Sequence, residues 1–156
     1  MRTLLTRALI ALAITTIGAL GADNSIGTWK LNMEKSKYSP APMPVKGLTI
    51  TREASDGGVK VSQTGEQADG TKINAGYTLK YDGKDVQVTG NAPYDTIAIK
   101  QVNANTFTDE RKKNNGSYRA TGRMVISGGG KTMTTTSKGT NGAGVAFTSV
   151  FVFDKQ

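Results

Sequence analysis

The chain has 156 residues, with 20 Lys and Arg against 12 Asp and Glu, and a formal net charge of +8. It contains no His and no Cys. These absences exclude Ser-His-Asp and Cys-His catalysis, disulfide scaffolds and the standard zinc sites.

The first 22 residues are typical of a secretory signal peptide. Arg2 and Arg7 are basic, residues 8–20 are mainly apolar, and Gly21 and Ala22 are small residues that precede Asp23. The apolar run is shorter than the roughly 20 residues of a membrane-spanning helix, so we expect no stable membrane insertion after cleavage. The sequence therefore predicts a signal peptide at 1–22, one domain at 23–156, and a periplasmic or extracellular location.

Beyond this leader, apolar residues recur two positions apart in short runs, as half-buried strands require. Clusters of Gly, Asp and Asn separate the runs and favour hairpin turns. The predicted strands lie at residues 26–31, 46–54, 59–64, 72–81, 85–89, 95–102, 106–112, 117–127, 131–138 and 145–153. Between the first two, Pro40, Pro42 and Pro44 do not fit a regular ladder, and residues 34–37 are expected to form at most a helical turn.

Strands that follow one another through hairpins form an antiparallel meander, which avoids exposed edges by curling until its first and last strands meet. We therefore expect an all-β, antiparallel up-and-down barrel of about 8–10 strands, and a monomer. Trp29 is the only Trp and lies on the first predicted strand. Closure would place it near Phe147, Phe151 and Phe153 on the last strand, in the largest aromatic cluster of the chain.

The segment Gly27-Thr28-Trp29-Lys30-Leu31 resembles the Gly-x-Trp signature that opens the first strand of calycins, the lipocalins and fatty-acid-binding proteins. The final residues, Phe151 to Gln156, are similar to the end of the fatty-acid-binding branch. The whole chain also resembles small secreted lipocalin-like proteins of bacteria. It departs from the fatty-acid-binding pattern at residues 32–45, which are too short for the two helices that usually follow the first strand.

The resemblance implies a non-catalytic barrel that binds a small apolar molecule in its lumen. Small residues that are candidates for the interior, Thr135, Ser137 and Ser149, fit either a cavity or a narrow filled barrel. The lumen candidates are Trp29, Tyr77, Leu79, Met124, Phe147, Phe151 and Phe153.

The resemblance also bears on the charge of the ligand. Fatty-acid-binding proteins that bury a carboxylate typically end in Arg-x-Tyr on the last strand, whereas this chain has Phe151 and Phe153 at those positions. Arg123 is expected to point outward because Met124 and Ile126 form the apolar face of its strand. A buried carboxylate would lack a partner, so we expect a neutral ligand, or one whose polar head stays at the barrel mouth.

The alternative is a structural barrel without ligand that contacts an acidic envelope component through a basic surface. That surface patch would contain Lys100, Arg111, Lys112 and Lys113. Such charges also serve solubility alone. Few aromatic residues accompany them, so no nucleic-acid partner is expected.

No residues in the sequence point to an enzyme, a cofactor or a metal. Asp109 and Glu110 are adjacent on a predicted strand, so their side chains should point to opposite faces and cannot act as a paired acid and base. The loop residues Asp69, Asp82 and Asp85 match no calcium-loop spacing.

Overall fold

The computed structural model describes residues 23–127 and 129–156, so the predicted signal peptide lies outside the described residues. The described part consists of strands and turns without helices, and it offers no helix that could cross a membrane. The strands are β1 (Gly27–Leu31), β2 (Lys37–Ser39), β3 (Val45–Ser55), β4 (Gly58–Gln67), β5 (Lys72–Leu79), β6 (Val86–Gln87), β7 (Thr89–Gly90), β8 (Thr96–Asn103), β9 (Thr106–Lys112), β10 (Arg119–Ser127), β11 (Thr132–Thr140) and β12 (Ala146–Lys155).

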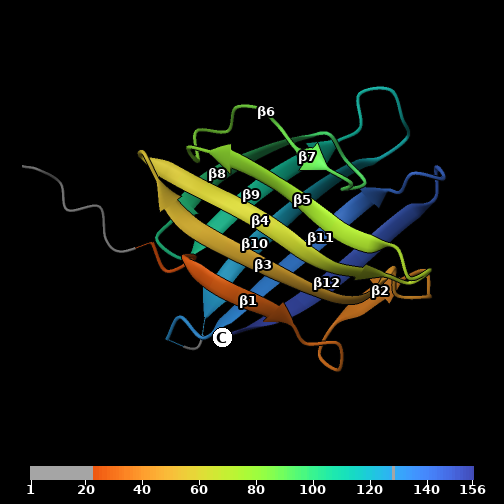
Figure 1. The fold of residues 1–156 in the computed structure, drawn as a ribbon, viewed down its shortest axis with the longest axis horizontal. Coiled ribbons are helices and arrows are strands. Elements are labelled where there is room, and N and C mark those ends of the chain that lie inside the picture. The colour runs from red at the N-terminus through yellow and green to blue at the C-terminus, as the bar shows by residue number, and fades with distance from the viewer. Residues whose placement is uncertain (1–22, 128) are drawn as a thin grey trace, which may run out of the picture.

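All of these strands belong to one antiparallel sheet in the order β6-β8-β9-β10-β11-β12-β1-β3-β4-β5-β7, with β2 paired to β12 (Figure 1). The first and last long strands meet, because β1 pairs with β12 from Trp29↔Lys155 to Leu31↔Phe153. The prediction of an all-β antiparallel up-and-down barrel is therefore confirmed.

The two edges of the sheet approach each other through residues 86–90. Val86 and Gln87 pair with β8, whereas Thr89 and Gly90 pair with β5. Gly90 has a φ of +86°, and a Cβ there would lie 2.0 Å from the carbonyl oxygen of Asn74. Only glycine fits this close approach to β5. Since residues 86–90 pair with both edges, the barrel is nearly closed.

The ten predicted strands are all present, and two differences account for the additional elements. The predicted strand 85–89 is divided into β6 and β7, and β2 is new. Residues 33–35 form a turn and not a longer helix, and the strand β2 begins at Lys37. The Ser36 hydroxyl donates to the Asn32 carbonyl at 2.6 Å and accepts from the Val152 amide at 3.0 Å. These bonds hold the segment against β12, and β2 ends immediately before Pro40, which has no N–H to continue the ladder.

One half of the barrel interior is tightly packed, and we call it the closed half. Trp29 is 0% exposed, and Phe107, Met133, Phe153 and Val59 are buried almost as completely. The Trp29 indole N–H donates to the Ser25 carbonyl at 2.8 Å, and the Lys155 ammonium lies 5.1 Å from the ring centroid. The single Trp therefore anchors the start of the domain inside the barrel.

A polar network seals the closed half. Arg52 is buried and donates from Nε to the Ser25 hydroxyl at 3.1 Å and from Nη2 to the Tyr81 hydroxyl at 2.9 Å. Tyr81 in turn donates to the Asp23 carboxylate at 2.8 Å. The first described residues thus contact β3 and the segment after β5, and they close this end of the lumen.

The expected aromatic cluster forms with different members. Phe147 stacks on Tyr38 with ring centroids 5.4 Å apart, Tyr118 lies 6.1 Å from Phe147, and Tyr94 lies 5.7 Å from Tyr118. The predicted cluster of Trp29 with three Phe residues is therefore wrong for Phe147, whereas Phe153 lies on β12 where that strand pairs with β1, and it shares the buried core with Trp29. Phe147 lies at the opposite end of β12 from Trp29, so the pleat places both inside the barrel without bringing them together.

Candidate functional site

The second half of the interior, which we call the open half, is built by inward residues of β9 to β12. The ladders align Asp109, Gly122, Ser137 and Ser149 in one row across these strands. The next row contains Arg111, Ala120, Gly139 and Phe147. Inward positions alternate with outward ones along each strand, so a polar row and a row with one cation face the lumen.

Several side chains of the open half keep slightly more accessible surface than the largest side chains of the closed half. Tyr77 is 9% exposed, and Tyr118, Phe147 and Ser149 are similar, compared with 0% for Trp29. Within residues 23–127 and 129–156, no fully buried side-chain polar atom lacks a hydrogen-bond partner. The hydroxyls of Tyr77 and Tyr118 have no protein partner there, so they must reach space that water can enter.

An ion pair lies in the open half. Arg111 Nε donates to Asp109 Oδ1 at 2.6 Å, and Arg111 Nη2 donates to the Ser137 hydroxyl at 2.6 Å. The two side chains are only 18% and 14% exposed. The guanidinium also lies 5.8 Å from the ring centroid of Tyr94, within cation–π range.

The environment of this pair keeps Arg111 charged. Burial by itself lowers the pKa of Arg111. The charge interactions with Asp109, Tyr118 and Tyr94 and the hydrogen bond to Asp109 raise it by a larger amount, so the net shift is upward. Burial raises the pKa of Tyr118 to about 12 and also raises the pKa of Tyr77 and of Tyr94. The tyrosines are therefore neutral at physiological pH, and the ion pair is the charged group of this lining.

Gly122 makes room for the Asp109 carboxylate. A Cβ at Gly122 would lie 2.2 Å from Asp109 Oδ2, far inside van der Waals contact. The carboxylate therefore lies directly over the backbone of β10, where the absence of a side chain fixes its position beside Arg111. Asp109 and Glu110 do point to opposite faces, since Glu110 is exposed.

The predicted surface patch is wrong for Arg111, which faces the lumen. Its position follows from strand parity, because Phe107, Asp109 and Arg111 alternate on one face of β9 and Phe107 is fully buried. Lys100 is exposed, but Lys112 pairs with Asp85 and Lys113 lies 3.9 Å from Asp95. The prediction considers only the charge of Arg111. The apolar Phe107, four residues earlier on the same face of the strand, is the sequence signal that Arg111 points inward.

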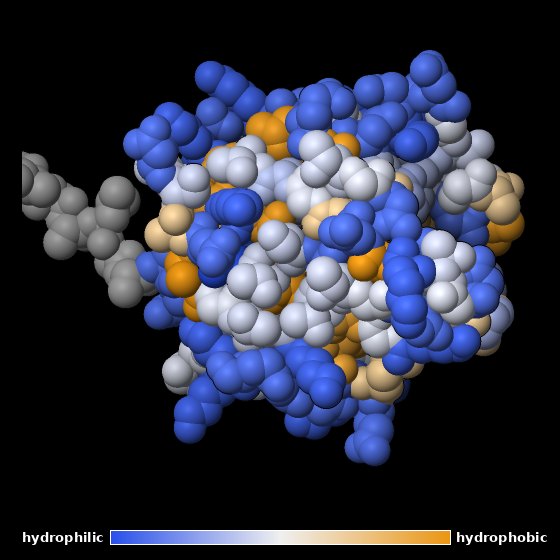
Figure 2. All heavy atoms as spheres, viewed as in Figure 1, coloured by the Kyte–Doolittle hydropathy of each residue, from blue (hydrophilic) through white to orange (hydrophobic). Residues whose placement is uncertain are grey.

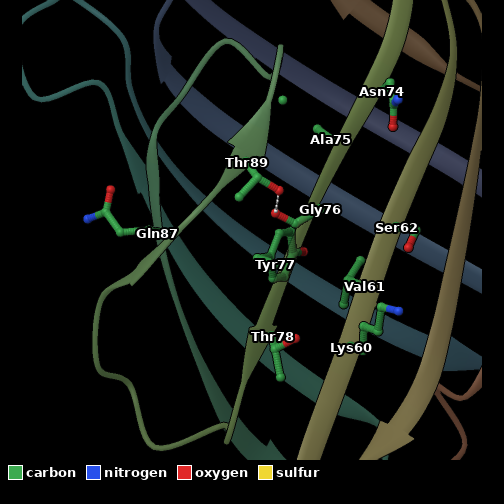
Figure 3. A pocket seen from close by; sticks show the side chains of 11 residues that line it. Lys60, Val61, Ser62, Asn74, Ala75, Gly76, Tyr77, Thr78, Gln87 and Thr89 are labelled. Atoms are coloured by element: carbon green, nitrogen blue, oxygen red, sulfur yellow. Dashed lines mark hydrogen bonds between the residues drawn. The ribbon is translucent and has the colours of Figure 1, made fainter.

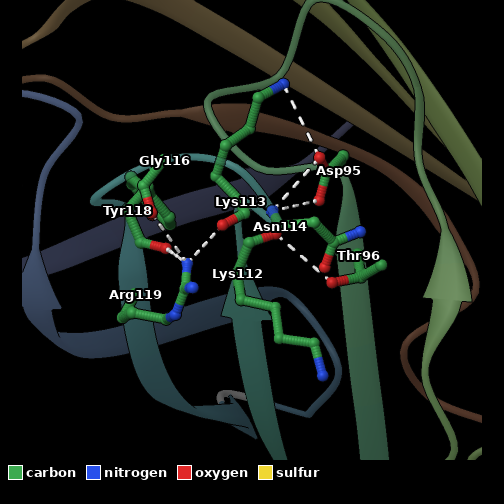
Figure 4. A network of polar contacts seen from close by, with 8 residues as sticks. All are labelled: Asp95, Thr96, Lys112, Lys113, Asn114, Gly116, Tyr118 and Arg119. Carbon is green, nitrogen blue, oxygen red and sulfur yellow. Dashed lines mark hydrogen bonds and ion pairs between the residues drawn. The ribbon is translucent and has the colours of Figure 1, made fainter.

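Polar contacts order the hairpin after β9 (Figure 4). The guanidinium of Arg119 donates from Nη1 to the carbonyl oxygens of Lys113, Gly116 and Tyr118. Asp95 accepts from the Asn114 amide at 3.0 Å. The guanidinium of Arg119 thus supports the chain locally, and an interaction of Lys100, Lys112 and Lys113 with an acidic component stays a prediction.

The lumen candidates all lie on inward positions. Trp29, Leu79 and Phe153 belong to the closed half, whereas Tyr77 and Phe147 border the open half. Met124 and Phe151 lie one row below Ser137 and Ser149, and Phe151 is half-buried. Arg123 is exposed, as expected. Their contact with a ligand stays a prediction.

Two grooves lie on the outer wall. One, of about 570 Å³, runs beside β4, β5 and β7, and the Thr89 hydroxyl donates to the Gly76 carbonyl at 3.1 Å at its edge (Figure 3). The other, of about 540 Å³, follows the ends of β9 to β12, and its lining combines outward residues with the inward row that contains Arg111 and Phe147. The outward side chains of the first, such as Ser62, Asn74 and Thr78, are small and polar and provide no unpaired carboxylate or aromatic platform.

No family model and no curated protein matches this chain. A crystal structure of zebrafish ileal bile acid-binding protein complexed with cholic acid aligns with a TM-score of 0.46 and 11% identity, over 85% of this chain and 99% of that chain. The described sheet by itself is a nearly closed antiparallel barrel.

Among the described residues no group of acidic side chains is placed to hold a metal ion. The Asp109 carboxylate accepts from Arg111, and the Ser137 hydroxyl accepts from the same guanidinium, so neither is activated as a base or a nucleophile.

Proposed function

We propose that the protein is a non-catalytic binding barrel that takes a small, mainly apolar and neutral molecule into its open half. The observation that carries the proposal is a difference in burial: Ser149 and Tyr118 are 8% and 7% exposed, whereas the large side chains Trp29, Phe107 and Phe153 are at most 1% exposed. A ligand would therefore rest above the packed closed half, against aromatic and small side chains.

The edge of the sheet next to β2 supports a route into this space. Beyond Leu31 the ladder between β1 and β3 ends, and β2 pairs with β12 but not with β3. The inward residues Leu48 and Phe151 on either side are half-buried. The outer surface is mainly hydrophilic, with hydrophobic side chains visible in recesses between polar ones (Figure 2). We propose that the ligand enters between β2 and β3.

The charge of the lining supports a neutral ligand. Arg111 and Asp109 neutralise each other, and the other polar groups of the open half are hydroxyls and the Gln63 side-chain amide, which donates to the Tyr94 hydroxyl at 3.2 Å. The proposed setting is the periplasm or the extracellular space, which rests on the signal peptide predicted from residues 1–22. Transport or storage of a hydrophobic molecule in water is a task that such a barrel suits.

Filling the open half tests the proposal. Ser149 points into the lumen, and its neighbour Thr148 is exposed on the outer face of the same strand. Ser149→Leu should weaken binding of a neutral fluorescent probe, such as cis-parinaric acid methyl ester, by about tenfold or more. Thr148→Leu is the matched control and should leave the affinity unchanged. Equal effects of the two substitutions, or no saturable binding by the wild type, would contradict the proposal.

A further inference from the structure

We propose that Asp109 determines the charge specificity of the lumen, by neutralising Arg111 and so excluding anionic ligands in favour of neutral ones. The inference rests on the proposed function of the open half and names the residue that sets its ligand class. The side chains of Arg111 and Asp109 are both more than four-fifths buried and face the same interior space, with Arg111 Nε 2.6 Å from Asp109 Oδ1.

Arg111 alone would make this interior an anion site. Its guanidinium is held in place by the Ser137 hydroxyl and the ring of Tyr94, and it stays charged in the folded protein. A fixed cation in partly desolvated surroundings attracts a ligand carboxylate and offers it paired N–H donors. Without Asp109, a free fatty acid would therefore bind more tightly than its ester.

Asp109 removes this attraction. Its carboxylate already accepts from Arg111 Nε, and the space over Gly122 holds it there. A ligand carboxylate that approached Arg111 would also meet the negative charge of Asp109, and like charges in a shared site oppose one another. A neutral ester, ketone or alcohol meets no such repulsion, and it leaves the ion pair intact.

The sequence provides a matched control one residue away. Asp109 and Glu110 are both acidic and neighbours on β9, but Asp109 faces the lumen and Glu110 faces solvent. Asp109→Asn and Glu110→Gln change the net charge of the protein by the same amount. Only the first leaves Arg111 without its carboxylate.

The test compares cis-parinaric acid with its methyl ester by fluorescence titration at neutral pH. The wild type should bind the ester more tightly. In Asp109→Asn the ratio of the acid Kd to the ester Kd should fall by about tenfold or more, and in Glu110→Gln it should stay at the wild-type value. The double variant Asp109→Asn/Arg111→Gln, which removes both charges of this ion pair from the open half, should lose the gain in acid binding.

Arg111→Gln keeps the test decisive if Asp109→Asn does not fold, as judged by circular dichroism. It leaves an uncompensated carboxylate, so the acid-to-ester Kd ratio should rise above the wild-type value. An unchanged ratio in every folded variant, or tighter binding of the acid by the wild type, would overturn the inference while leaving a ligand-binding barrel. Failure of the wild type to bind either probe would instead contradict the proposed function, and the inference with it.

Discussion

At the scale of single residues, Trp29 has the clearest structural role. Its indole is fully buried, its N–H has a partner, and its ring contacts the last strand through Lys155. Trp29→Ala should lower the free energy of unfolding by about 3–5 kcal/mol, as for other buried large aromatics. Chemical denaturation measures the loss, and the folded wild type should show blue-shifted emission. An emission maximum like that of Trp in water, with an unchanged Tm in the variant, would show that Trp29 is not an anchor.

Gly122 offers a second residue-scale prediction, because its missing side chain provides the space for Asp109. Gly122→Ala should destabilise the protein by about 1–3 kcal/mol, since the Cβ overlaps the carboxylate and displaces it from Arg111. Gly142→Ala is the control: nothing lies within 4 Å of that Cβ, so the change should stay within about 0.5 kcal/mol. Thermal unfolding measures the Tm of both variants, and we expect a lower value for Gly122→Ala than for Gly142→Ala. Equal Tm values would contradict the packing described for Asp109.

Tyr118 gives the open half a pH signature. Burial raises its pKa to about 12, whereas the phenol ionises near pH 10 in the unfolded chain. A raised folded pKa contributes stability that is fully present below pH 10 and is lost between about pH 10 and 12, because only the unfolded chain loses its proton in that range. A shift of this size corresponds to about 3 kcal/mol.

Urea denaturation at pH 9 and pH 11 measures this effect. The free energy of unfolding should fall between the two values for the wild type, and it should fall less for Tyr118→Phe. Tyr118→Phe should behave like the wild type at pH 7, because its hydroxyl has no protein partner among the described residues. Identical pH dependence of the two proteins would show that Tyr118 is solvated in the native state.

At the scale of elements, the weakest part of the barrel is the closure by β6 and β7. Only two residues of each strand pair with the neighbouring edge, and Asn91 supports them: its side chain accepts from the Asn74 amide at 2.8 Å and donates to the Lys72 carbonyl at 2.6 Å. Few ladder bonds mean low local stability. Hydrogen exchange of residues 86–90 should therefore be faster than that of β10 and β11.

Asn91→Ala should accelerate that exchange further, by removing two hydrogen bonds worth about 1 kcal/mol each. The increase should be confined to the segment around β5 and β7. Mass spectrometry of exchanged peptides provides the readout. Equal protection of residues 86–90 and of β10 in the wild type would mean that the barrel is closed more firmly than the ladder indicates.

The elements also show what the sequence could predict. The alternation of apolar residues places all ten expected strands, because a barrel wall has one buried and one solvated face. It does not reveal β2, whose three residues are too few for a period and whose pairing depends on Ser36. Nor does it reveal the division at Val88, which depends on two edges that meet only in the folded barrel.

The site was less predictable than the wall. The run from Asp109 to Lys113 has the composition of a solvated hairpin, and charge alone places Arg111 outside. Arg111 and Asp109 lie an even number of residues from the buried Phe107, so they point to the same inner face of the strand. The burial of their charges also depends on residues from three other segments, Gly122, Ser137 and Tyr94. No local pattern carries that information.

The whole barrel consists of a packed half that stabilises the fold and an open half that we propose as the binding site of a neutral ligand. Titration of the isotopically labelled domain with a neutral apolar ligand, followed by amide NMR shifts, tests this division most directly. Saturable shifts should cluster at Ala120, Ser137 and Ser149, and should be absent around Trp29 and in the outer groove beside Thr78. No saturable shift, or shifts confined to the outer wall, would contradict the account.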